Sequence, residues 1–382
     1  MNNETRKETQ VLPKDIRYIG ADDLTLLLFE NQYPVQPMGV SYNSYLILDE
    51  KVAVMDSVDA RAADEWLAKL AHELDGRRPD YLVISHMEPD HSGSILRLAE
   101  KYQEMKLVGN TKTFTMLRQF FGASAPANER LVEVGEGGTI SLGTHTLHFM
   151  LAPMVHWPEV MVAYEETEKI LFSADAFGRF GALSRTAAAP WAPQARRYYY
   201  NIVGKYGAQV QALLKKASAL EIKTVCPLHG PVLTGEALGE ALRLYDLWSR
   251  WQSEAPEEIL LAHASIHGNT ARAAELLKQK LEAKGARVTL CDLTTTEVSY
   301  AVANAFYCGK LVLACSTYDG GLFPPMEEFL SHLQAKGFRD RSVGLIENGS
   351  WAPAAARLMC ARLEEMKDLR VCGTVVSLRS AL

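Results

Sequence analysis

The feature that most constrains the fold is the segment Ser85–Ser94, SHMEPDHSGS, which follows an apolar run beginning at Tyr81. Such a run is typical of a buried strand. Pro89 and Gly93 predict that the segment is a loop, in which alternate side chains can converge on one point past the edge of a sheet. Four potential metal ligands lie within six residues of this loop: His86, Glu88, Asp90 and His91.

Three further ligand-type side chains stand beside apolar runs downstream. Asp175 follows KILFSA, His229 follows TVCPL, and His156 lies in the turn MVHWPE between two apolar runs. The alternative is that these are unrelated polar residues, and for an isolated histidine such as His145 that reading is the better one. For the seven together it is not, because burying three carboxylates side by side without a cation would be unfavourable. The sequence therefore predicts a metal site.

Cysteine does not contribute to this predicted site. None of the six cysteines forms a C-x-x-C pair with another. We expect them to be reduced and mostly buried. The metal must then be held by histidine and carboxylate, and the chain has no built-in rubredoxin-type centre.

Length and charge limit the remaining possibilities. The chain has 382 residues and a net charge of −6, so we expect a soluble protein of two domains without nucleic acid as its partner. The sequence has neither an apolar run long enough for a membrane span nor a signal peptide, which predicts no membrane partner and a cytoplasmic location. A polar stretch, WQSEAPEE at Trp251–Glu258, places the domain boundary so that residues 1–253 form the first domain and residues 254–382 the second.

The two parts of the chain differ in the order of their predicted strands and helices. In the first, strands such as Val52–Met55 alternate with helical patterns, and a hairpin is expected over Leu142–Leu151, so its sheets should be mixed. The second is an α/β pattern typical of a doubly wound parallel sheet. Its expected strands are Ile259–Ala264, Arg287–Leu290, Leu311–Cys315 and Val343–Ile346.

Three loops of the second part follow these strands at the edge where ligands of such sheets bind. The first, SIHGNT from Ser265, precedes a helix and offers hydroxyl, amide and backbone donors suited to a terminal phosphate, although a plain helix cap would use the same residues. The others, STYDGGLFPP and ENGSWAP, carry Tyr318, Phe323 and Trp351. Each aromatic alone could be packing, but the three together favour a flavin ring.

The first part resembles the metallo-β-lactamase fold, an αββα sandwich whose two-metal site uses an H-x-[HE]-x-D-H loop and a later His, Asp and His. The resemblance assigns His86, Glu88 and His156 to one metal and Asp90, His91 and His229 to the other, with Asp175 as the bridge. The zinc hydrolases of this fold have histidine where this chain has Glu88. A carboxylate there makes the site harder and more anionic, which suits iron better than zinc.

The second part resembles flavodoxin, which implies FMN. The resemblance and the three loops together give the expected flavin-binding residues: Ser265, Ile266, His267, Gly268, Asn269, Thr270, Ser316, Thr317, Tyr318, Asp319, Gly320, Gly321, Asn348, Gly349, Ser350 and Trp351. After the last apolar stretch, Val371–Leu378, the sequence stops where flavodoxins add a closing helix, so we expect that helix to be absent.

The two halves together resemble the flavodiiron proteins, also called A-type flavoproteins. That resemblance implies an oxidoreductase with FMN and two non-haem irons, which reduces dioxygen to water, nitric oxide to nitrous oxide, or both. It also implies an external electron donor, such as rubredoxin or a reduced deazaflavin, and a head-to-tail homodimer or a dimer of dimers. The alternatives are a zinc-dependent hydrolase with an accessory flavodoxin domain and a non-catalytic electron carrier. Phe29, Trp157 and Tyr198 are candidates for the wall of the gas pocket, although packing is the better reading for each taken singly.

Overall fold

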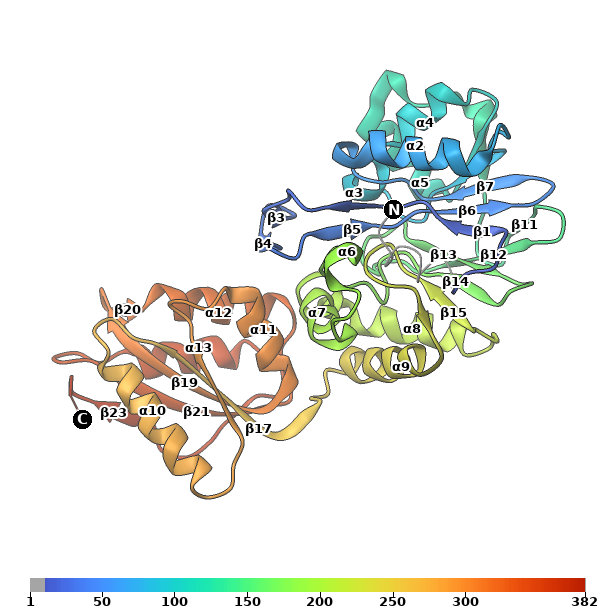
Figure 1. The fold of residues 1–382 in the computed structure, drawn as a ribbon. Helices are drawn as coiled ribbons and strands as arrows, with labels where there is room; N and C mark the ends of the chain where they lie inside the picture. The colour runs from blue at the N-terminus through green and yellow to red at the C-terminus, as the bar shows by residue number, and fades with distance from the viewer. Residues whose placement is uncertain (1–10, 382) are drawn as a thin grey trace. The chain divides into compact units, whose positions relative to one another are not determined.

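The computed structural model describes residues 11–381, and the chain forms two compact units (Figure 1). The first unit comprises the chain up to Tyr199 together with Ala208–Asp246. The second comprises Tyr200–Gly207 and the chain from Leu247 onward. The division of the chain into domains at residues 253 and 254 stays a prediction.

Two six-stranded sheets form the centre of the first unit. In spatial order, the first sheet consists of β1 (Ile16–Tyr18), β6 (Tyr45–Leu48), β7 (Val52–Met55), β8 (Tyr81–Val83), β9 (Lys106–Gly109) and β10 (Leu131–Glu133). The second consists of β11 (Thr139–Ser141), β12 (Thr146–Leu151), β13 (Met161–Glu165), β14 (Ile170–Phe172), β15 (Thr224–Cys226) and β16 (Leu233–Thr234). Both sheets are mixed, as predicted: β6 and β7 are antiparallel, whereas β7 and β8 are parallel.

Helices cover the outer faces of the paired sheets, which confirms the αββα sandwich. Figure 1 shows α2 (Ala63–Leu74), α4 (Ile95–Lys101) and α5 (Thr111–Phe121) on one side, and α8 (Gly207–Ala217) and α9 (Gly235–Ser249) on the other. Between the sheets lies a core in which Val83, Phe149 and Phe172 are all at most 2% exposed. Burial of these side chains stabilises the packing of β8, β12 and β14 between the sheets, and segments that carry predicted ligands follow these strands.

One part of the predicted metal loop is helical. Pro89–Ser92 forms a single helical turn, α3, rather than the loop expected from Pro89 and Gly93. Proline is compatible with the first position of a helix, where its missing N–H has no intrahelical partner. The carbonyl of Glu88 accepts the N–H groups of His91 and Ser92 at 2.9 and 2.8 Å, so the turn fixes the spacing of these ligands.

Short elements near the sandwich complete the first unit. They are the paired strands β2 (Ala21–Asp23) and β5 (Val40–Tyr42), the hairpin of β3 (Leu28–Phe29) and β4 (Tyr33–Pro34), and the helices α6 (Leu183–Thr186) and α7 (Trp191–Tyr198). A π-helical turn, Tyr199–Val203, follows α7, and its residues from Tyr200 onward belong to the second unit.

The second unit contains a parallel sheet with the strand order β18-β17-β19-β21-β22, which is the flavodoxin-like order 2-1-3-4-5. Its strands are β17 (Ala255–Ala264), β18 (Val288–Asp292), β19 (Cys308–Tyr318), β20 (Gly321–Leu322), β21 (Ser342–Asn348), β22 (Arg370–Val371) and β23 (Val376–Leu378). Its helices are α10 (Asn269–Glu282), α11 (Val298–Tyr307), α12 (Pro324–Ala335) and α13 (Ala355–Glu364). The predicted doubly wound sheet is therefore confirmed.

Two predicted segments of this unit differ in detail. Residues 255–258, expected to be part of an irregular connection, already belong to β17, because Ala255 pairs with Cys308 before a register shift at Ile259. The last apolar stretch forms two short strands, β22 and β23, and both run parallel to β21. Among residues 11–381 no helix is long and apolar enough to cross a membrane.

Candidate functional site

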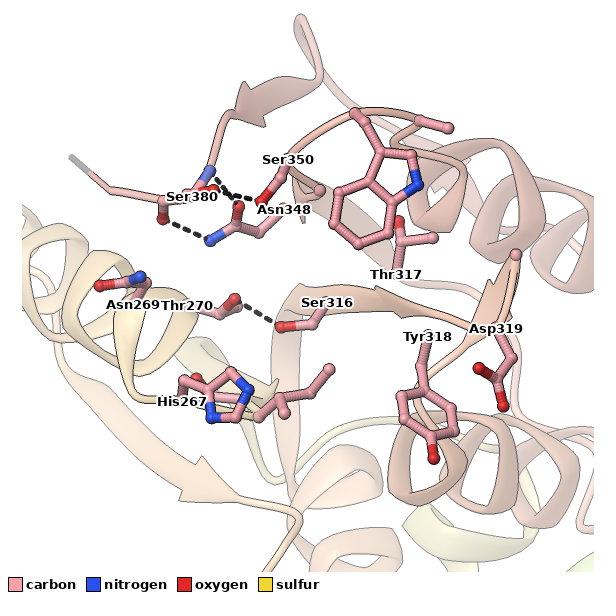
Figure 2. A pocket seen from close by; sticks show the side chains of 16 residues that line it. His267, Asn269, Thr270, Ser316, Thr317, Tyr318, Asp319, Asn348, Ser350 and Ser380 are labelled. Carbon is pink, nitrogen blue, oxygen red and sulfur yellow. Dashed lines mark hydrogen bonds between the residues drawn. The ribbon is translucent and has the colours of Figure 1, made fainter.

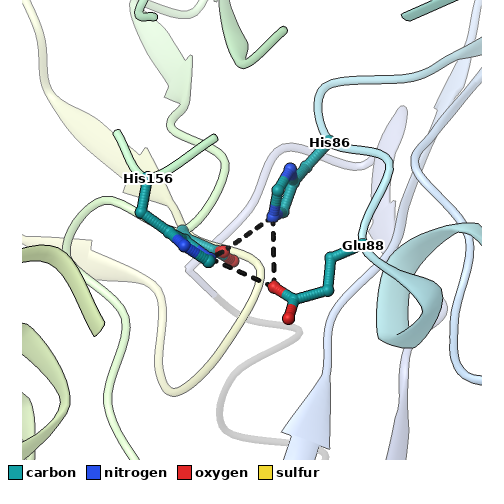
Figure 3. A group of neighbouring side chains, drawn as sticks. His86, Glu88 and His156 are labelled. Atoms are coloured by element: carbon teal, nitrogen blue, oxygen red, sulfur yellow. Dashed lines mark hydrogen bonds and ion pairs between the residues drawn. The ribbon is translucent and has the colours of Figure 1, made fainter. Parts of the chain in front are cut away.

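The seven predicted metal ligands lie in two neighbouring groups in the first unit. The first group consists of His86, Glu88, His156 and Asp175, and the second of Asp90, His91 and His229. Within each group the donor atoms lie within 4.8 Å of one another. In the first group, Oε2 of Glu88 lies 3.2 Å from Nε2 of His86 and 3.1 Å from Nε2 of His156 (Figure 3). In the second, Oδ2 of Asp90 lies 3.3 Å from Nε2 of His91 and 3.2 Å from Nε2 of His229.

Asp175 joins the two groups through its two carboxylate oxygens. Its Oδ2 lies 3.4 Å from Nε2 of His86 and 3.0 Å from Nε2 of His156. Its Oδ1 lies 3.2 Å from Nε2 of His91 and 3.7 Å from Nε2 of His229. One carboxylate thus faces two histidines of each group, which is the arrangement of a bridging ligand.

These distances fit metal coordination. Metal–ligand bonds of about 2.1 Å place neighbouring ligand atoms about 3.0 Å apart in an octahedron and about 3.4 Å apart in a tetrahedron. In addition, both carboxylate oxygens of Asp90 and of Asp175 are buried without a hydrogen-bond partner among residues 11–381. Four buried anionic oxygens would be costly without a cation, so the residues present fit two divalent metal ions.

The backbone around two of the ligands is held in an unfavourable conformation. Ala174 and Phe177, which flank Asp175, have φ angles of 51° and 67°, and Met154, two residues before His156, has a φ of 66°. Residues other than glycine avoid this left-handed region, and such strain gathers at functional sites.

The charges of the ligands reinforce one another. Burial opposes protonation of His156, but the adjacent carboxylates of Asp175 and Glu88 raise its pKa to about 9. Burial likewise disfavours the ionised form of Asp175, but the surrounding histidines hold its pKa well below the ordinary value. The Asp175 carboxylate therefore stays ionised, and its two buried oxygens favour a cation between the two groups.

The three predicted wall residues all lie beside ligand histidines. The ring centroids of Phe29 and Tyr198 lie 5.4 and 5.5 Å from that of His229, and the centroid of Trp157 lies 5.1 Å from that of His86. The hydroxyl of Tyr198 is buried without a hydrogen-bond partner among residues 11–381. Burial, with Asp175 nearby, raises the pKa of Tyr198 well above its ordinary value, so this hydroxyl remains protonated.

A cavity of about 550 Å³ leads to the metal ligands from the β3–β4 hairpin. Its lining includes Glu30, Tyr42 and Arg61, none of which the sequence indicated, together with Glu88 and Asp90. Desolvation of the Glu30 carboxyl group and the adjacent Glu88 carboxylate raise the pKa of Glu30 to about 7.

Two ligand histidines make hydrogen bonds through their outer nitrogens. Nδ1 of His229 lies 2.7 Å from the carbonyl oxygen of Ser41, and Nδ1 of His86 lies 2.8 Å from Oε1 of Glu159. Neither partner was identified from the sequence. A carboxylate at the end of MVHWPE was a signal for Glu159, but nothing local connected it with His86.

The second unit contains a cavity of about 630 Å³ at the carboxyl ends of β17, β19 and β21 (Figure 2). Most of the predicted flavin-binding residues line it: Ser265, Ile266, His267, Asn269, Thr270, Ser316, Thr317, Tyr318, Asp319, Gly320, Asn348, Gly349, Ser350 and Trp351. Gly268 and Gly321 do not line it, and neither does Phe323, whose ring lies 5.7 Å from that of Tyr318. Ala352 and Ser380 also line the cavity.

Hydrogen bonds hold the loops of this cavity together. Oγ1 of Thr270 and Oγ of Ser316 lie 2.8 Å apart, which joins the start of α10 to the end of β19. Oγ1 of Thr317 accepts the N–H groups of Ala354 and Ala355 at 3.0 and 3.3 Å. These hydrogen bonds fix the loops that line the cavity. The N-terminus of α10 lies at the cavity, where its free N–H groups can bind an anionic phosphate.

Known proteins resemble this chain over nearly its whole length. A family model described as ODP family beta lactamase matches residues 40–230. The nitric oxide reductase of Moorella thermoacetica is 28% identical over 361 residues, which make up 92% of this chain and 88% of that protein. The solved structure of rubredoxin oxygen:oxidoreductase from Desulfovibrio gigas aligns with a TM-score of 0.89 and 25% identity, covering 97% of this chain and 93% of that one. The flavodiiron protein from Giardia intestinalis aligns with a TM-score of 0.86 and 25% identity, covering 95% and 91%.

Proposed function

The chain belongs to the ODP family of beta lactamases and is a flavodiiron protein, and we propose that it reduces dioxygen to water, nitric oxide to nitrous oxide, or both. The observation that carries this proposal is the pair of ligand groups that share Asp175 and include the carboxylate of Glu88. The names of the relatives favour this activity over a zinc-dependent hydrolase with an accessory flavodoxin domain.

Each ligand has a role in this proposal. His86, Glu88 and His156 would hold one iron, Asp90, His91 and His229 would hold the other, and Asp175 would bridge them. Two histidines, one terminal carboxylate and a shared carboxylate at each metal leave positions open for a diatomic gas. The four-electron reaction, O2 + 4 e⁻ + 4 H⁺ → 2 H2O, and the two-electron reaction, 2 NO + 2 e⁻ + 2 H⁺ → N2O + H2O, both draw on the electrons that FMN and two irons supply when bound.

The surrounding side chains define where the gas binds. Phe29, Trp157 and Tyr198 make an apolar wall beside the ligand histidines, and such a wall limits the entry of bulk water. The protonated hydroxyl of Tyr198 is free to donate a hydrogen bond to an oxygen atom of the gas.

FMN would occupy the cavity of the second unit. The loop Ser265–Thr270 would bind its phosphate at the start of α10, while Tyr318 and Trp351 would flank its ring. The predicted ring contact of Phe323 is not part of this proposal. The Thr270–Ser316 hydrogen bond would keep the phosphate loop in place when FMN binds.

We propose that the protein acts as a head-to-tail homodimer or a dimer of dimers, in which the flavin cavity of one copy meets the metal groups of another. Apolar side chains at the two sites support this. Trp351 at the flavin cavity is 89% exposed, Leu27 directly before β3 is 68% exposed, and Phe120, which stacks on Trp157, is 47% exposed. Exposed apolar patches of this kind mark association surfaces.

Electrons would come from a separate donor, such as rubredoxin or a reduced deazaflavin. The six cysteines provide no C-x-x-C pair that could serve as an internal rubredoxin centre. A cytoplasmic location stays a prediction.

The test is metal analysis and turnover of one preparation. Protein expressed with iron and without added zinc is expected to contain two irons and one FMN per chain. It should consume dioxygen or nitric oxide in an anaerobic stopped-flow experiment with chemically reduced rubredoxin as donor. The matched control is Asp175→Asn, which preserves the size of the side chain and should abolish gas consumption while retaining FMN.

Two results would count against the proposal. Two zinc ions together with thioester hydrolysis would favour the hydrolase. Full gas consumption by Asp175→Asn would show that the two ligand groups are not the site of reduction, and it would favour a simple electron carrier acting through its flavin.

A further inference from the structure

The two ligand groups differ in the hydrogen-bond partners of the Nδ1 atoms of their histidines. In the first group, Nδ1 of His86 lies 2.8 Å from a carboxylate oxygen of Glu159, and both side chains are fully buried. In the second, Nδ1 of His229 meets the neutral carbonyl of Ser41. Nδ1 of His91, also in the second group, is buried without a hydrogen-bond partner among residues 11–381. Of these three outer nitrogens, only Nδ1 of His86 therefore has a carboxylate as its direct partner. The buried carboxyl group of Asp56 interacts with His91 and His86 and so does not distinguish the two groups.

Glu159 is held firmly in this position. Its Oε1 also accepts a hydrogen bond of 2.9 Å from the N–H of Met87, the residue that follows His86 in the chain. Its carbonyl oxygen accepts a hydrogen bond of 2.6 Å from Asn110, whose side chain also caps α5. A fully buried carboxylate is unfavourable unless it is paired, so its placement against His86 calls for a role beyond packing.

The number of carboxylates at each group indicates that role. Apart from the shared Asp175, the first group has Glu88 among its ligands and the second has Asp90. Glu159 adds a second carboxylate to the first group alone. A carboxylate that accepts the Nδ1–H of a histidine fixes the tautomer with its Nε2 lone pair toward the metal and makes that nitrogen a stronger ligand.

We propose that Glu159 is a positioning residue that orients His86 and makes the His86 group the tighter of the two iron sites. The inference rests on the proposed two-iron centre and adds an order of filling to it. The first equivalent of Fe²⁺ binds at His86, Glu88 and His156, and the second binds at Asp90, His91 and His229.

The test is an anaerobic Fe²⁺ titration of metal-free protein against a competing chelator, which yields two dissociation constants. Glu159→Gln retains an oxygen that can accept the Nδ1–H of His86 but removes the charge. Loss of such a supporting partner typically weakens metal binding by about 10- to 100-fold. We expect this loss in the tighter constant, with the weaker constant unchanged, so that the two constants approach each other.

A matched control exists on the neighbouring strand. Glu165 is also a fully buried carboxylate, and its Oε1 lies 3.0 Å from Nδ1 of His145, a histidine outside both ligand groups. Glu165→Gln removes the same kind of buried charge from the same kind of histidine. It should destabilise the fold while leaving both iron constants at the wild-type values.

The outcomes separate this inference from the proposed function. If the wild type takes up no iron, the two-iron function fails. If the wild type takes up two irons but Glu159→Gln leaves both constants unchanged, or weakens both equally, the role of Glu159 is wrong and the function stands. If Glu159→Gln does not fold, the Mössbauer spectrum of the wild type loaded with one equivalent of ⁵⁷Fe tests the order of filling instead. One dominant Mössbauer doublet supports the inference, and two equal doublets overturn it.

Discussion

The side chain of Asn348 and the backbone of Ser380 exchange two hydrogen bonds, each 2.9 Å long, across 32 residues of chain. Asn348 ends β21, and the pair links that strand end to the segment after β23, beside the flavin cavity (Figure 2). Because both residues line the cavity, the pair fixes one of its walls.

We therefore predict that Asn348→Ala weakens FMN binding. Two backbone groups of Ser380 lose their partners, and about 1.4 kcal/mol of lost stabilisation corresponds to a tenfold change in affinity. A loss of about tenfold is expected in a titration of FMN-free protein followed by quenching of flavin fluorescence. Ser377→Ala is the control, because Ser377 on β23 bonds Glu347 rather than a cavity residue. Equal affinities for Asn348→Ala and the wild type would refute the prediction.

A second prediction concerns the number of metal ions lost. Asp175 faces histidines of both ligand groups, whereas the ion pairs of Asp90 among residues 11–381 are with His91 and His229 of the second group. Asp175→Asn should therefore weaken both iron sites, and Asp90→Asn only one. Elemental analysis after dialysis against a weak chelator should find close to no iron in the first variant and about one iron per chain in the second. One retained iron in Asp175→Asn would mean that this residue does not bridge.

The clustering of the seven residues was predictable because their positions follow from local pattern. His86, Asp175 and His229 each follow an apolar strand, and strands of one sandwich end at a common edge. The sequence could not reveal the supporting residue Glu159, because its role depends on a hydrogen bond to a ring 73 residues away. That contact is set by how the turn before β13 packs, which has no local signal.

The residues of the flavin cavity likewise include some that the sequence indicated and some that it did not. Loops such as Ser265–Thr270 were visible as strand ends followed by helix starts. Ser380 was not, since it reaches the cavity only through the pairing of β23 with β21. Phe323 is the N-cap of α12, and it does not line the cavity, although its ring lies 5.7 Å from that of Tyr318. An aromatic in a loop does not show its direction in the sequence.

A third prediction addresses the stability of the second unit. The guanidinium group of Arg341 is buried and donates to the carbonyl oxygens of Trp251, Phe306 and Cys308 at 3.0 Å each. Arg341→Met leaves these acceptors without their donor, which costs about 3 kcal/mol or more. The FMN-loaded variant should release its flavin at clearly lower urea concentrations than the wild type. Arg357→Met, at an exposed position on α13, should not, and equal midpoints for both variants would contradict the assigned role.

The last prediction concerns pH and His145, whose Nδ1 lies 3.0 Å from Glu165 and whose Nε2 lies 2.9 Å from Asp15. The hydrogen bond to Glu165, with that to Asp15, raises the pKa of His145 from 6.5 to about 9, although burial opposes this. A folded-state pKa above the unfolded value means that protonation stabilises the fold. The contribution is complete below about pH 6.5 and is lost as the pH rises through 9.

The size of this effect follows from the shift. At 1.36 kcal/mol per unit, it amounts to about 3 kcal/mol between pH 6.5 and 9. Urea unfolding of metal-loaded wild type and His145→Gln at pH 6, 7.5 and 9 measures it. The free-energy difference between the two proteins should be largest at pH 6 and should shrink steadily toward pH 9, because the wild type alone loses a bound proton over that range. A difference that stays constant with pH would mean that His145 does not change its protonation on folding.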